Sequence, residues 1–179
     1  KTIRSTSTIA NDYIITGKAR GYTNKALTVT GDMIVNGTYD QAWSGFTATL
    51  TLSTLNVSGT FISNNDTISA SGDIFVLNGG VYNSSLGKAD TFNSLTTESG
   101  GTYSATSGTT TITGENAAGR AIDIQSGSTL TANAGTMRID TAGTTIVIFS
   151  GTGNPYDFIA SGADVQWNTA VTIDNNLTV

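Results

Sequence analysis

Few residues in this chain could do acid–base chemistry, and four of them form a repeated pattern. Arg120 and Asp123 are followed by Arg138 and Asp140, and each aspartate comes directly after an isoleucine. If the two segments stack, the four charges share one face and could cleave a polysaccharide, a reaction that uses paired carboxylates or a carboxylate with calcium and a base. We favour the alternative, a solvated charge ladder in which each ion pair contributes under about 1 kcal/mol.

Three aromatic residues could form a ligand-binding surface. Trp43, Phe46 and Trp167 carry rings that could stack on sugars, which makes surface glycans a candidate partner. A tryptophan in a short strand is more often part of a core, and we favour that interpretation.

Other chemistry is excluded by residue type. The chain contains no histidine and no cysteine, which removes Cys/His zinc sites, Ser-His-Asp and Cys-His nucleophiles and disulfides. The pairs Gly31-Asp32, Gly72-Asp73 and Asn65-Asp66 are typical of turns, and none continues as a calcium loop with alternating acidic ligands. We therefore expect no catalytic residue, no metal and no cofactor.

Charge and hydropathy restrict the partners. The net charge is -5 and no cluster of Lys or Arg is present, which argues against nucleic acid because phosphate binding needs concentrated positive charge. No apolar run approaches the roughly 20 residues of a membrane helix, so we expect no membrane span.

The composition favours strands and turns as the elements that carry these residues. Thr, Ser, Asn and Gly make up 87 of the 179 residues, whereas charged residues are only 12%. The apolar stripe of a helix is missing, and only 116–125 could hold a helical turn. Short alternations of apolar and polar residues predict strands instead. They are Leu27/Val29, Met33/Val35, Leu50/Leu52, Leu55/Val57, Ile122/Ile124, Val165/Trp167, Val171/Ile173 and Leu177/Val179.

A repeat organises these strands. A glycine, a small or β-branched residue and an aromatic residue recur four times, with the glycines 22, 21 and 21 positions apart. The glycines are Gly37, Gly59, Gly80 and Gly101, and the aromatic residues are Tyr39, Phe61, Tyr82 and Tyr103. Because equal positions in successive repeats lie above one another, these four rings should form a structural aromatic ladder.

The period predicts an all-β, single-stranded parallel β-helix, or β-solenoid, with coils of about 21 residues. Each coil would contribute three short strands, with Gly, Asn and Ser at the corners. About eight coils at roughly 4.8 Å each would form a rod of roughly 40 Å. The alternative is a β-sandwich or jelly roll, which also has short strands but needs no constant period. We expect residues 1–179 to form a single domain that belongs to a longer repeat array.

The segments 55–61, 95–103 and 163–179 resemble the degenerate repeats of right-handed parallel β-helix proteins, such as secreted bacterial adhesins, autotransporter passengers and phage surface fibres. The likeness covers most of residues 27–179. It implies an extracellular, cell-surface or virion-surface location and a structural or adhesive role, and it transfers no catalytic residue.

The last strand pattern, 176–179, restates that of 27–29, and no charged or helical cap follows it. An uncapped coil exposes unpaired backbone groups, so we expect either neighbouring coils of a longer chain or self-association in a fibre or homo-oligomer. The resulting prediction is a non-enzymatic structural segment of a surface fibre or filament. A carbohydrate-binding adhesin domain and a polysaccharide lyase or hydrolase remain as alternatives.

Overall fold

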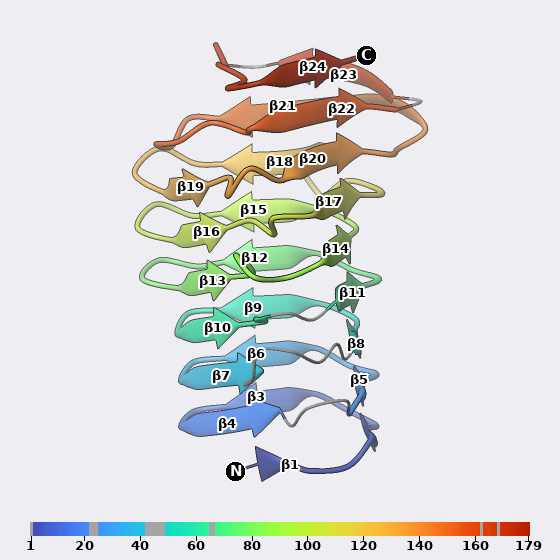
Figure 1. Ribbon diagram of the computed structural model, residues 1–179, viewed down its shortest axis with the longest axis vertical. Coiled ribbons are helices and arrows are strands. Elements are labelled where there is room, and N and C mark those ends of the chain that lie inside the picture. The colour runs from blue at the N-terminus through green and yellow to red at the C-terminus, as the bar shows by residue number, and fades with distance from the viewer. Residues whose placement is uncertain (1, 22–24, 42–48, 65–66, 162, 168) are drawn as a thin grey trace.

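The fold is a parallel β-solenoid. The computed structural model describes residues 2–21, 25–41, 49–64, 67–161, 163–167 and 169–179, and no helix occurs within those ranges. The chain winds through about eight coils of roughly 21 residues, stacked from the N-terminal end to the C-terminal end (Figure 1). The predicted all-β solenoid is therefore confirmed, and the sandwich alternative is not formed.

Within the described ranges, the strands of successive coils form three parallel sheets of seven, nine and eight strands. The first sheet contains β1 (Thr2–Ile3), β4 (Lys18–Gly21), β7 (Thr38–Gln41), β10 (Thr60–Ile62), β13 (Val81–Asn83), β16 (Thr102–Ser104) and β19 (Thr129–Thr131). The second contains β2 (Ser7–Ile9), β5 (Leu27–Val29), β8 (Thr49–Leu52), β11 (Thr67–Ala70), β14 (Ala89–Phe92), β17 (Thr109–Ile112), β20 (Thr136–Ile139), β22 (Asp157–Ala160) and β24 (Asn176–Thr178). The third contains β3 (Tyr13–Ile15), β6 (Met33–Val35), β9 (Leu55–Val57), β12 (Ile74–Val76), β15 (Leu95–Thr97), β18 (Arg120–Ile124), β21 (Gly143–Phe149) and β23 (Ala163–Trp167).

The core fills the inside of the coils with columns of apolar side chains. Alternate residues of a strand point inward, and residues paired between coils continue the same column. One such column is Met33, Leu55, Ile74, Leu95 and Ile122 of the third sheet, all fully buried. Because every coil covers its neighbour's apolar edge, the core grows along the rod and not outward.

The repeated glycines lie at a corner where successive coils touch. A Cβ built on Gly37 would lie 2.1 Å from the carbonyl oxygen of Gly17, and one on Gly59 would lie 2.1 Å from that of Gly37. No side chain fits at those distances. The glycine of the sequence repeat is therefore required by the close approach of two backbones, just before the strands of the first sheet begin.

One coil is longer than the others. Tyr103 pairs with Leu130, a step of 27 residues, because a seven-residue loop at 113–119 replaces a corner that is two residues long in the preceding coil. The helical turn expected within 116–125 is not formed, because the loop leads directly into the extended strand β18.

The C-terminal region also departs from the prediction at one segment. The alternations at 165–167 and 177–179 fall in or at β23 and β24, but 171–173 is not a strand. Val171 and Ile173 still pack against the core as partly buried side chains. The strand predicted at 171–173 is therefore wrong, although the alternation identified two residues that pack inward.

Candidate functional site

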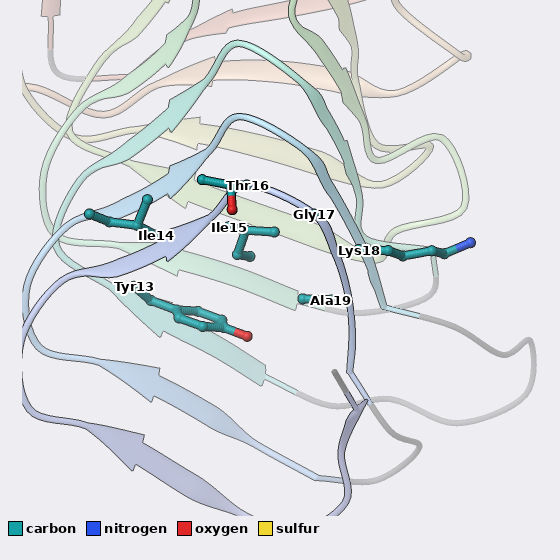
Figure 2. A pocket seen from close by; sticks show the side chains of 7 residues that line it. All are labelled: Tyr13, Ile14, Ile15, Thr16, Gly17, Lys18 and Ala19. Atoms are coloured by element: carbon teal, nitrogen blue, oxygen red, sulfur yellow. The ribbon is translucent and has the colours of Figure 1, made fainter.

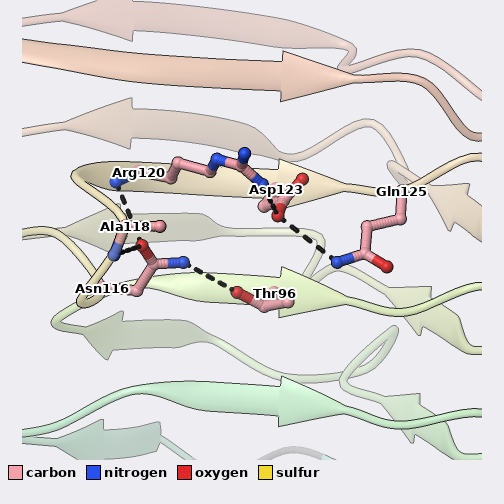
Figure 3. A network of polar contacts seen from close by, with 6 residues as sticks. All are labelled: Thr96, Asn116, Ala118, Arg120, Asp123 and Gln125. Atoms are coloured by element: carbon pink, nitrogen blue, oxygen red, sulfur yellow. Dashed lines mark hydrogen bonds and ion pairs between the residues drawn. The ribbon is translucent and has the colours of Figure 1, made fainter.

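The loop 113–119 builds the most elaborate polar cluster on the outer surface of the third sheet. Asn116 closes the loop: its Oδ1 accepts hydrogen bonds from the backbone N–H groups of Ala118 at 2.9 Å and of Arg120 at 3.1 Å. Its Nδ2 donates to Oγ1 of Thr96 at 3.2 Å, which ties the loop to the strand below (Figure 3). Thr96 is only 6% exposed as a result, although it lies at an outward position of β15.

Arg120 and Asp123 form an ion pair beside this loop. Nη1 of Arg120 lies 2.6 Å from Oδ2 of Asp123, and Nε2 of Gln125 donates to the same oxygen at 3.4 Å (Figure 3). The Asp123 side chain is 5% exposed, whereas that of Arg120 is 38% exposed. The carboxylate is thus held by two donors from its own segment and is largely covered.

The structure divides the four predicted charges between two faces. Asp123 lies on β18 of the third sheet and Arg138 lies on β20 of the second sheet, so the two segments do not pair. Arg138 instead makes its own ion pair with Asp140 at 3.4 Å, on a well-exposed corner. The single charge ladder proposed from the sequence is therefore not formed. A cleavage site of the paired-carboxylate kind needs two carboxyl groups about 5 to 9.5 Å apart across one substrate. Asp123 lies on β18 of the third sheet, whereas Asp140 directly follows β20 of the second sheet.

Of the three residues of the candidate aromatic surface, the structure describes Trp167. The Trp167 ring packs on the core, 4.8 Å from the Phe158 ring and 6.3 Å from the Phe149 ring between centroids. It is partly buried and continues the apolar interior of the last coils. Trp43 and Phe46 lie outside the described residues.

The four rings of the sequence repeat stack inside the first sheet. Successive centroids of Tyr39, Phe61, Tyr82 and Tyr103 are 5.3, 5.0 and 5.0 Å apart, with interplanar angles of 13° to 21°. All four side chains are fully buried. The hydroxyl groups of the three tyrosines then need partners inside the core: Tyr39 donates to Gln41, and Tyr103 shares a hydrogen bond of 3.3 Å with Thr110.

A buried carboxyl group, that of Asp90, lies beside the stacked rings. Asp90 occupies an inward position of β14 between Ile68 of the coil below and Thr110 of the coil above, and it is fully buried. The Tyr82 hydroxyl donates to Oδ2 of Asp90 at 2.9 Å, while Oδ1 has no hydrogen-bond partner among the described residues. Burial raises the pKa of Asp90 from 3.8 to about 7, against the opposing effect of contacts with Ser84, Tyr82 and the backbone of Ile68.

Asp90 was not predicted as a buried residue, although the sequence carries a signal for it. The second-sheet strands place Leu50 and Ile68 at the equivalent inward position, so an aspartate in that register contradicts the pattern.

Burial and the neighbouring Asp90 also raise the pKa of the Tyr82 hydroxyl well above its usual value. This group is therefore a neutral, hydrogen-bonded phenol.

Hollows occur near both ends of the rod, and two of them lie at opposite ends. One, of about 260 Å³, follows the corner between β3 and β4 and is lined by residues 13–19; Tyr13, Ile15 and Ala19 line its inner side, and Lys18 points away (Figure 2). The other, of about 230 Å³, lies beside Asp157, Phe158 and Leu177. Neither includes the Arg120–Asp123 pair or Asp90.

The geometry defines the protein's class, a parallel β-solenoid with a tyrosine-rich internal stack. Comparison with protein-family models, with curated proteins and with solved structures finds no match to this chain. Among the described residues, no cluster of three or more acidic side chains could hold a metal ion, and no helix could cross a membrane.

Proposed function

We propose that the chain is a non-enzymatic structural segment of an extracellular or virion-surface fibre, in which it forms a rigid rod and presents columns of side chains to its neighbours. The observation that carries this proposal is the continuity of the three parallel sheets and of the stacked rings along the rod. A shaft needs strands that continue along its length, and the strands of successive coils stack on one another along the rod (Figure 1).

Local stability supports the same role. Interior strands are hydrogen-bonded to the coils on both sides, and the corner between β14 and β15 is only two residues long. Such backbone has few segments that can open to a protease without breaking several coils. Four of the eight basic residues, Lys18, Arg20, Arg120 and Arg138, lie within strands, where trypsin has poor access.

The partners in this proposal are further coils of the same kind. A β-solenoid coil offers a row of backbone donors and acceptors to whatever stacks on it, and a matching coil satisfies them all. These coils could belong to the same chain or to a second copy, so the proposed fibre includes self-association.

The proposal is tested by locating the protein in its native source. Antibodies raised against the folded chain should label a filament, a cell surface or a virion in immunogold electron microscopy. Labelling confined to the cell interior would overturn the location. Release of reducing or unsaturated ends from a panel of polysaccharides by the purified chain would overturn the non-enzymatic role.

A further inference from the structure

The outward face of the second sheet carries a regular array of hydroxyl groups. Its first column is Thr49, Thr67, Ala89, Thr109 and Thr136, and its second column is Thr8, Thr28, Thr51, Ser69, Thr91 and Thr111. Members of a column are paired residues of successive coils. From β8 to β17 the two columns lie side by side, with the inward residue of each strand between them. We call these eleven positions the hydroxyl array; ten carry a Thr or Ser.

The hydroxyl groups of the array are not used by the protein. Within the described part of the chain, none of them makes a hydrogen bond to another residue. Threonines at the adjoining corners behave differently: Oγ1 of Thr30 donates to the carbonyl of Ile9 at 3.3 Å, and that of Thr113 to the carbonyl of Phe92 at 2.9 Å. The array therefore keeps its full hydrogen-bonding capacity for something outside the molecule.

The spacing of the array is fixed in two directions. Paired strands of a sheet lie about 4.8 Å apart along the rod, and alternate residues of one strand lie about 6.6 to 6.8 Å apart across it. The pairings from β2 to β20 contain no register shift, so the columns run straight. Threonine is stiff about χ1, so each threonine of the array holds one methyl and one hydroxyl group in a defined place.

We propose that the hydroxyl array is an ice-binding face. Both of its repeats are close to oxygen–oxygen repeats on the surfaces of hexagonal ice, and a rigid, regular row of methyl and hydroxyl groups can order water into that lattice. Water held between the side chains then bridges the protein to the crystal by hydrogen bonds nearly as favourable as direct ones. The solenoid supplies the ordering in advance, so little conformational entropy is lost on binding.

The chemistry of the array disfavours other ligands. None of its eleven positions carries a charged residue, whereas phosphate or nucleic acid needs positive charge. Beyond the array, Asp157 follows Thr136 in the first column and Arg138 follows Thr111 in the second. The array contains no aromatic ring on which a sugar could stack. The outward positions of the first sheet provide a contrast, since they mix Lys18, Arg20, Asp40 and Ile62 with threonines.

The experiment compares a bulky substitution on the two sheets. Thr51→Tyr and Thr91→Tyr interrupt the second column at two coils, and Thr60→Tyr is the matched control at an outward position of the first sheet. Thermal unfolding first checks that all three variants retain the fold. Thermal hysteresis, the gap between melting and freezing of a single ice crystal, and inhibition of ice recrystallisation are then measured for the intact 179-residue chain and each variant.

The proposal requires hysteresis and recrystallisation inhibition for the unmodified chain, a fall to buffer level for the array variants, and no loss for Thr60→Tyr. An unmodified chain without effect on ice at millimolar concentration overturns it. So does ice activity that survives both array substitutions, or equal loss in the first-sheet control. Binding to insoluble cellulose or chitin without activity on ice would also overturn it, in favour of a crystalline polysaccharide as the ligand.

Discussion

The buried carboxyl group of Asp90 makes the stability of the solenoid depend on pH. In the unfolded chain this group ionises near 3.8, whereas in the folded protein its pKa is about 7, because the ionised form has little solvation inside the core. Between those two values the unfolded chain loses a proton that the folded protein keeps. Folding therefore takes up a proton, and the free energy of unfolding falls as the pH rises through this window.

The magnitude follows from the two pKa values. They differ by about 3 units, and each unit corresponds to about 1.4 kcal/mol, which gives a loss of about 4 kcal/mol between pH values below 4 and above 7. The group is fully buried, so solvent does not screen this contribution. Since single domains are stable by only about 5 to 15 kcal/mol, the loss is a large fraction of the total.

Asp90→Asn removes the titration and keeps the shape of the side chain. The variant should resemble the protonated protein, with an amide that still accepts the Tyr82 hydroxyl bond. Urea unfolding followed by circular dichroism at pH 4, 5, 6, 7 and 8 measures the effect. The midpoint of the unmodified chain should fall across the series by an amount equivalent to about 4 kcal/mol. That of Asp90→Asn should fall much less.

Asp140→Asn is the matched control, because it also removes one carboxylate, but on an exposed corner. It should keep most of the pH dependence of the unmodified chain. The reasoning is refuted if Asp90→Asn and Asp140→Asn show the same pH dependence, or if stability rises between pH 4 and 7 in the unmodified chain and in Asp90→Asn alike.

Four further predictions test the packing and the candidate site. Phe61→Asp places a charge inside the aromatic stack and should lower the free energy of unfolding by more than about 3 to 5 kcal/mol, the loss typical of Phe→Ala. An unchanged melting temperature would show that the ladder does not contribute to stability. Gly59→Ala forces a Cβ against the Gly37 carbonyl and should lower the unfolding midpoint, whereas Gly17→Ala, which meets no atom within 4 Å, should change it little. Asn116→Ala removes three hydrogen bonds and should destabilise by about 1 to 3 kcal/mol, with hydrogen exchange faster in 113–119 than elsewhere. Trp167→Ala should lower thermal stability without changing a glycan-array profile, and selective loss of a glycan signal would instead favour the carbohydrate-binding alternative.

The sequence predicted the fold because its signals are local. The alternation of apolar and polar residues at 27–29, 33–35 and 55–57 determines which side chains point inward in each strand. The regular glycine–aromatic spacing then determines that equal positions meet, since parallel strands in successive coils pair in register. Neither inference requires knowledge of residues far away in the chain.

The candidate site depended on information that is not local. Whether Asp123 and Asp140 share a face depends on which sheet each strand joins, and the seven-residue loop at 113–119 breaks the period at that point. Two similar sequence motifs were therefore placed on different sheets. Asp90 was missed for a related reason: the cost of a buried carboxyl group depends on its surroundings, here Tyr82 and the covering coils, which no single repeat reveals.

The sequence by itself thus determined the repeat, the inward columns and the aromatic ladder, because period and alternation fix them strand by strand. Only the tertiary structure decided which outward residues lie in one plane. The threonines of the second sheet come from widely separated repeats, and they form an array because the coils stack in register, which aligns their hydroxyl groups at the spacing of paired strands.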